Sequence, residues 1–210
     1  MDVASRRPGG GFWLLWVSAS TIGFALGSTS VGYFGNAIIS GAPAWLANAA
    51  QPVLFVALAT LPGILHWLIL RHWFSGAGWW ILASGAGSLV GFVPLGWALA
   101  MADTHGDTIS VWNFALPTRI IVLVSVAVAG AAAGAMQWLV LRHWVSRAGW
   151  WVLASSISWV VSTYVYAYVT RANDVRLALG GVASGALSGA ITGIVLVRLM
   201  RGRQKVASRL

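Results

Sequence analysis

Long uncharged, mostly apolar stretches alternate along this chain with short segments that carry the charges. Asp, Glu, Lys and Arg are absent between Arg7 and Arg71, and from residues 72–102, 120–141, 148–170 and 177–197. A helix needs about 20 mostly apolar residues to cross a bilayer, and continuous runs favour helices over barrel strands, which alternate polar and apolar residues. The pattern predicts six membrane-spanning helices, near residues 12–33, 50–70, 79–101, 119–141, 149–170 and 177–199.

Two segments of the chain repeat one another at an offset of 71 residues. Gly63–Trp73 with Gly78–Ser84 returns as Gly134–Trp144 with Gly149–Ser155, and Gly193–Arg201 is a fainter third copy. Each unit is an outward helix followed by a returning helix that ends in arginine, so all units have one orientation. We therefore predict an all-α integral membrane protein, a six-helix transmembrane bundle built from three parallel two-helix repeats around a pseudo-threefold axis. The expected repeats are about 12–71, 79–142 and 149–201 of a single transmembrane domain, residues 1–210, with a basic cytoplasmic tail at 202–210.

Small residues recur every four positions in these helices. This spacing places them on one helix face, where small side chains let membrane helices approach closely. We expect these faces to pack the bundle itself; the long row on the last helix is also a candidate oligomer interface. The expected packing glycines are Gly23, Gly27, Gly63, Gly87, Gly91, Gly130, Gly134, Gly185, Gly189 and Gly193.

Composition and charge distribution agree with a membrane location. The chain is 59% hydrophobic and 8% charged, with a mean hydropathy of +0.80, which is far too apolar for a soluble domain of this size. Most of the net charge of +9 falls on one side of the predicted helices, so the positive-inside rule places both termini in the cytoplasm. Anionic lipid headgroups are the expected partners of that side, and we predict no nucleic-acid partner because no basic helix or aromatic RNA-binding platform is present.

The repeated motif also resembles a known group of proteins. Gln137-Trp138-Leu139-Val140-Leu141-Arg142, followed by Ala148-Gly149-Trp150-Trp151-Val152-Leu153-Ala154, is similar to a repeat in uncharacterised bacterial multipass membrane proteins. The resemblance covers the second to fifth helices and implies topology, with no activity attached. The predicted location is the bacterial cytoplasmic (inner) membrane.

His66 and Gln137 occupy equivalent repeat positions, each followed by a tryptophan, Trp67 and Trp138. These four residues are the candidate ligand-binding side chains, since a polar group inside a membrane helix is costly unless it is used. A neutral His66 imidazole could ligate a haem or a chlorophyll-type pigment. The structural alternative is a hydrogen bond from His66 to a backbone carbonyl freed by Pro62.

Basic and aromatic side chains mark the predicted cytoplasmic surface. Arg71 with His72, and Arg142 with His143, are expected to contact lipid headgroups. The pairs Trp79-Trp80 and Trp150-Trp151 are expected to anchor the same surface. On the opposite side, the segments 34–49 and 102–118 are expected to lie in the interface as a cap or a lid.

Catalysis has little support in the sequence. Glutamate and cysteine are absent, and all four aspartates lie outside the predicted helices. Asp103, His105 and Asp107 cluster in one loop, where an extended backbone could ligate a metal ion; solvated turn residues are the alternative. We therefore predict a non-enzymatic accessory or assembly subunit of a larger membrane complex or homo-oligomer. The alternatives are a binder or transporter of a small apolar or aromatic ligand, such as a lipid, quinone or pigment, and a membrane enzyme that uses the loop acids.

Overall fold

The chain folds into long helices. A computed structural model describes residues 8–30, 43–104, 116–170 and 176–207, and within these residues it is helical, without strands. The helices are α1 (Gly10–Ser30), α3 (Ala44–Leu70), α4 (Trp79–Thr104), α5 (Leu116–Leu141), α6 (Trp150–Thr170) and α7 (Arg176–Ala207).

Four stretches of the described residues are long and apolar enough to cross a membrane. They are Gly10–Ser30, Leu116–Leu141, Trp150–Thr170 and Arg176–Gly202, and a shorter apolar stretch covers Thr60–Leu70. These helices support a membrane protein, because only helices and closed barrels satisfy their backbone groups inside a bilayer.

Two helices are longer than their apolar segments predict. Helix α3 begins at Ala44, directly after Pro43 with φ −57° and ψ 145°, and thus before the predicted start at residue 50. Helix α7 runs to Ala207, so most of the predicted tail at 202–210 is helical. Of the predicted interface segments, residues 44–49 belong to α3, 102–104 to α4 and 116–118 to α5; apart from Pro43, the rest lies outside the described residues.

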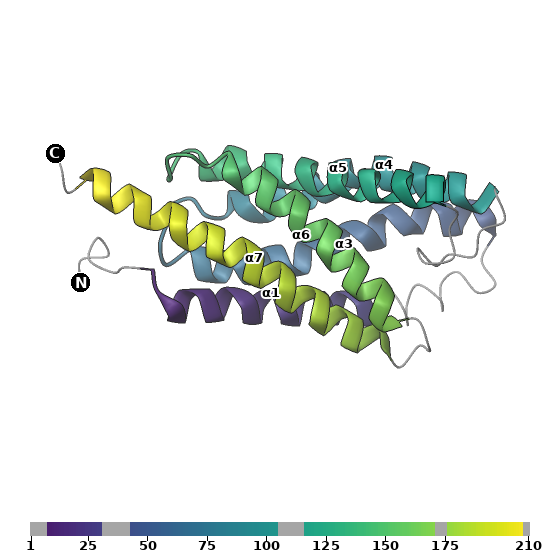
Figure 1. Ribbon diagram of the computed structural model, residues 1–210, viewed down its shortest axis with the longest axis horizontal. Helices are drawn as coiled ribbons and strands as arrows, with labels where there is room; N and C mark the ends of the chain where they lie inside the picture. The colour runs from purple at the N-terminus through teal and green to yellow at the C-terminus, as the bar shows by residue number, and fades with distance from the viewer. Residues whose placement is uncertain (1–7, 31–42, 105–115, 171–175, 208–210) are drawn as a thin grey trace.

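The six helices form a closed ring. Each helix contacts its neighbours in chain order, and α7 packs against α1 to close the ring. Figure 1 shows that α1 begins, and α7 ends, at the end of the bundle that carries the α3–α4 and α5–α6 turns. We call this end, which carries Arg71, Arg142, Arg147, Arg198 and Arg201, the arginine end. The backbone oxygen of Pro8 accepts a hydrogen bond of 3.1 Å from Arg201 Nε, which ties the start of α1 to the end of α7.

Glycine allows close backbone contact where α1 meets α3 and α7, and where α5 meets α4 and α6. A methyl group added at Gly87 of α4 would lie 2.6 Å from Ala133 Cα of α5, and one at Gly23 of α1 would lie 2.8 Å from Pro62 Cα of α3. Both distances are too short for a real side chain, so glycine is required at these crossings. Similarly close neighbours face Gly63, Gly91, Gly130, Gly134, Gly185, Gly189 and Gly193, and Gly27 is buried. The row on α7 lies against α1, so it does not form a free outer face.

Candidate functional site

Three tryptophans from different helices meet inside the ring. Trp16 of α1, Trp80 of α4 and Trp151 of α6 contact one another edge to face, with ring centroids 6.0, 6.0 and 5.5 Å apart. Their helices are alternate members of the ring, so side chains that meet across all three fill its interior. We call these residues the tryptophan cluster.

The cluster corrects one expectation from the sequence. The pairs Trp79-Trp80 and Trp150-Trp151 were expected to be interfacial anchors, but Trp80 and Trp151 are 0% and 2% exposed, whereas Trp79 and Trp150 are 68% and 61% exposed. Adjacent residues of a helix point about 100° apart, so only one member of each pair can face the lipid. The sequence also contains a pattern that distinguishes the buried tryptophan of each pair, because all three cluster residues lie three positions before an Ala-Ser pair.

Gln137 connects two helices through its amide. Its Nε2 donates a hydrogen bond to Ser84 Oγ of α4 at 3.0 Å, and its Oε1 accepts one from Trp151 Nε1 of α6 at 2.8 Å. The amide therefore uses a donor and an acceptor at once. Gln137 holds α4 and α6 on either side of α5.

His66 occupies the equivalent position on α3 but forms different contacts, with residues of α1. Its Nε2 lies 2.8 Å from Ser20 Oγ, and its ring stacks on Trp16 with centroids 3.8 Å apart. Ser20 Oγ also lies 3.0 Å from the Trp16 carbonyl oxygen, to which it donates, and this geometry fits a His66 tautomer with the proton on Nε2. The partner of Nε2 is thus a hydroxyl on α1, whereas the sequence suggested a backbone carbonyl.

Because His66 contacts α1, one buried hydrogen-bond donor near it is left unpaired. Trp80 Nε1 is buried and has no hydrogen-bond partner among the described residues. The sequence repeat aligns Trp80 with Trp151 and His66 with Gln137, so the partner expected for Trp80 is His66, which contacts Ser20 and Trp16 instead. A buried unpaired donor costs about 1–3 kcal/mol, and this cost falls on the His66 junction.

The third member of the cluster takes another partner. Leu196 stands at the position of His66 and Gln137 in the last copy, and its side chain forms no hydrogen bonds. Trp16 Nε1 donates instead to Thr192 Oγ1 of α7 at 3.0 Å, one helical turn away from Leu196.

The tryptophans next to these polar residues lie under arginines. The Arg71 guanidinium carbon is 5.2 Å from the centre of the Trp67 ring, and that of Arg142 is 5.3 Å from Trp138, a cation–π distance in both cases. Trp67 and Trp138 also pack against the buried core. His72 and His143 follow these arginines and are exposed, as a headgroup contact requires; headgroup and ligand binding by this set stay predictions.

The two turns of the arginine end have the same backbone conformation. Both Trp73 and Trp144 donate to a leucine carbonyl three residues earlier at 2.9 Å, and each turn contains one residue with positive φ, Gly76 at 76° and Arg147 at 62°. Glycine adopts this conformation freely, whereas another residue does so at a cost of about 1–2 kcal/mol. The second turn therefore holds Arg147 in a strained conformation.

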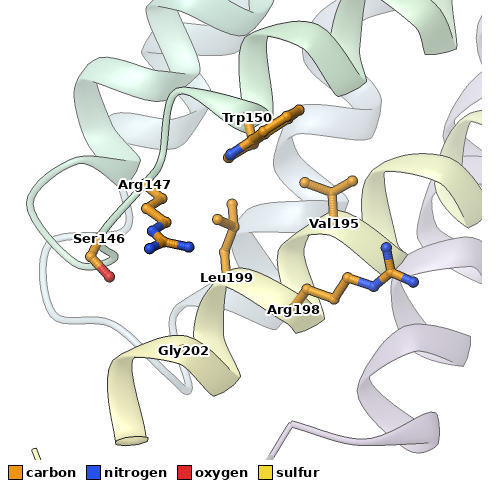
Figure 2. Close-up of a pocket in the computed structure, with 7 residues that line it drawn as sticks. All are labelled: Ser146, Arg147, Trp150, Val195, Arg198, Leu199 and Gly202. Carbon is orange, nitrogen blue, oxygen red and sulfur yellow. The ribbon is translucent and has the colours of Figure 1, made fainter. Parts of the chain in front are cut away.

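An open pocket of about 550 Å³ lies between that strained turn and the end of α7. Figure 2 shows the Arg147 guanidinium and the indole nitrogen of Trp150 on one side of Leu199, with the Arg198 side chain extending on the other side. We call this the arginine pocket, lined by Ser146, Arg147, Trp150, Val195, Arg198, Leu199 and Gly202.

No protein-family model, curated protein or solved structure matches this chain. The resemblance to bacterial multipass proteins therefore stays a prediction. The chemistry of the site has to be read from its own residues.

The geometry limits what His66 can ligate. Its Nε2 is engaged by Ser20 and one face of its ring is covered by Trp16, so an axial bond to a pigment through Nε2 requires that hydrogen bond to break. The described residues contain no group of three His, Asp or Glu able to hold a metal ion. The proposed loop ligands His105 and Asp107, and the side chain of Asp103, lie outside the described residues.

Proposed function

We propose that this protein is a non-enzymatic membrane protein that crosses the bilayer six times and serves as an accessory or assembly subunit of a larger membrane complex or homo-oligomer. The observation that carries the proposal is the packed tryptophan cluster. Trp16, Trp80 and Trp151 fill the interior of the ring at the arginine end, where a channel or transport path along the axis would have to pass. A filled axis supports a static, structural role.

The polar residues of the interior support the same role. Gln137 joins α4 to α6, and His66 joins α3 to α1, so these side chains use their hydrogen bonds to fix neighbouring helices. Buried polar networks whose members are bonded rigidify a structure. Such a bundle offers a preformed surface for other subunits.

A three-unit architecture fits this role. The two turns with the same hydrogen bonds, and the tryptophans at equivalent positions of α1, α4 and α6, support three helix pairs around a pseudo-threefold axis. Because each pair returns to the same side, both termini belong with the arginine end, which the positive-inside rule assigns to the cytoplasm.

Partners in the membrane have to bind the outer faces of the ring, because the glycine faces are used inside it. The outer faces carry large aliphatic side chains, including Leu14 and Leu26 on α1, Val93 on α4 and Ile157 on α6. Contact through such side chains gains little over lipid per unit area. A stable partner interface is therefore expected to be extensive.

Native mass spectrometry in mild detergent, with an absorption spectrum, tests the proposal. We expect the chain to run with other subunits or copies of itself, without a bound chromophore. Because the chain has no cysteine, single cysteines at Val93 and Ile157 can be cross-linked in native membranes, with the buried Val126→Cys as the matched control. A monomer carrying a stoichiometric small molecule that His66→Ala abolishes would contradict the proposal and favour the ligand-binding alternative.

A further inference from the structure

The arginine pocket has positive charge without a counterion among the described residues. Arg147 and Arg198 form no hydrogen bond or ion pair with any described residue. The chain has only four acidic side chains, and Asp103, in the last turn of α4, is separated from the arginine end by a helix of 26 residues, or about 39 Å. Asp2, Asp107 and Asp174 lie outside the described residues. Within the part of the chain that the structure describes, no side chain therefore supplies an anion to this pocket.

Both arginines depart from the repeat at the same place. The offset of 71 residues aligns Arg147 with Gly76, and alignment of the helix-ending arginines, Arg142 with Arg201, aligns Arg198 with Leu139. The corresponding pocket of the earlier copy thus has glycine and leucine at these two positions. Two independent differences converge on one pocket, which indicates a feature added to the fold and not required by it.

The strained backbone at Arg147 also indicates that its side chain serves a binding site. Gly76 shows that this turn forms with glycine at the positive-φ position, so arginine there weakens the turn locally. Strained residues are found where a binding site uses the side chain. In Figure 2 the Arg147 guanidinium faces the pocket beside Trp150.

We propose that the arginine pocket binds the phosphate of an anionic phospholipid headgroup, with Arg147 and Arg198 as its anion-binding groups. Guanidinium groups form charge-assisted hydrogen bonds to phosphate oxygens, and basic pockets between membrane helices bind such headgroups. Exposed arginine side chains change rotamer within nanoseconds, so Arg198 can swing toward a phosphate held by Arg147. The proposal goes beyond the structural role above and does not depend on it.

The rest of the pocket favours a lipid over a free anion. Trp150 begins α6 at the level of the arginines, and Val195 and Leu199 form an apolar wall on α7. An acyl glycerol attached to the phosphate gains contact with these side chains, whereas inorganic phosphate gains nothing from them.

Lipid titration of the purified protein tests the proposal. Delipidated protein in detergent is titrated with phosphatidylglycerol, phosphatidylcholine or inorganic phosphate while thermal unfolding is recorded, and native mass spectrometry counts the bound lipids. We expect phosphatidylglycerol alone to raise the Tm, with one molecule retained per chain. Equal stabilisation by inorganic phosphate or by phosphatidylcholine would overturn the assignment to an anionic lipid.

Three variants make the test specific to the pocket. Arg147→Gly relieves the strained turn, so we expect a lipid-free Tm at least equal to that of the wild type, together with about a tenfold loss of phosphatidylglycerol affinity. Arg198→Gln is expected to lose affinity similarly. Lys205→Gln removes the same charge elsewhere on the arginine end and is expected to bind as the wild type does. Undiminished binding by Arg147→Gly, or an equal loss in Lys205→Gln, would refute the site.

Discussion

His66 lies flat against Trp16, with the two ring planes only 4° from parallel. The equivalent residue Gln137 stacks on no tryptophan in this way and bridges Ser84 and Trp151 with two hydrogen bonds. One repeat therefore uses a ring stack and one hydrogen bond where the other uses two hydrogen bonds. This difference accounts for the unpaired Trp80 Nε1. It also identifies the His66 junction as the place where a substitution could add a hydrogen bond to the interior.

Replacing His66 with glutamine should give Trp80 a partner. In His66→Gln the new amide can donate to Ser20 and accept from Trp80, as Gln137 does for Ser84 and Trp151. We expect Trp80→Phe to cost about 0.5–1 kcal/mol more in the His66→Gln protein than in the wild type, the size of a hydrogen bond between membrane helices. A double-mutant cycle, with free energies of unfolding measured in SDS, checks this. Equal costs in both backgrounds would show that the glutamine does not reach Trp80.

The tryptophans of the cluster should differ in their sensitivity to phenylalanine. Trp151→Phe removes a hydrogen bond to Gln137, whereas Trp80→Phe removes an N–H group that is already unpaired. Both changes leave a similar cavity, so the comparison isolates the hydrogen bond. We expect Trp151→Phe to destabilise more by about 0.5–1.5 kcal/mol, as measured by thermal unfolding in detergent with circular dichroism. The reverse order would mean that Trp80 has a partner, such as bound water.

Two glycines on one helix should respond oppositely to alanine. Gly87→Ala forces a methyl group against the Ala133 backbone, whereas a methyl group at Gly85 meets only Thr60 Oγ1, at 3.4 Å. We expect Gly87→Ala to destabilise by about 1–3 kcal/mol because the helices must separate. Gly85→Ala should be neutral or stabilising, since alanine favours a helix by up to about 1 kcal/mol over glycine. Unfolding of the pair in SDS measures this difference, and equal effects would refute the close α4–α5 crossing.

The positions of the helices could be predicted from the sequence, because charge-free runs indicate where helices lie, and α3 and α5 end directly before Arg71 and Arg142. The side-chain partners could not be predicted, since they depend on which helix lies beside which. The bond from His66 to Ser20 exists because α3 packs against α1, and no local pattern states that contact. The arginine pocket was missed for a related reason: Arg198 is one residue in an apolar helix, and its proximity to Arg147 arises only when α7 lies along the turn.

The orientation of the bundle can be tested with single cysteines. Ser75→Cys and Ser146→Cys lie in the turns of the arginine end, where both serines are exposed, whereas Ser110 belongs to the segment between α4 and α5. With cytoplasmic termini, a membrane-impermeant maleimide added to intact cells should label Ser110→Cys and spare the other two. Labelling of Ser75→Cys and Ser146→Cys before cell disruption would reverse the topology.

The hydrogen bond from Trp16 to Thr192 joins residues that are 176 positions apart, and this separation has a consequence for biosynthesis. At about 5–20 residues per second, a ribosome needs roughly 9 to 35 s to reach Thr192 after making Trp16. Throughout that interval the face of α1 that packs against α7, including the Trp16 indole N–H, lies in the bilayer without α7 to cover it. Nascent chains stalled before α7 are therefore the form of this protein most open to membrane chaperones and quality-control proteases.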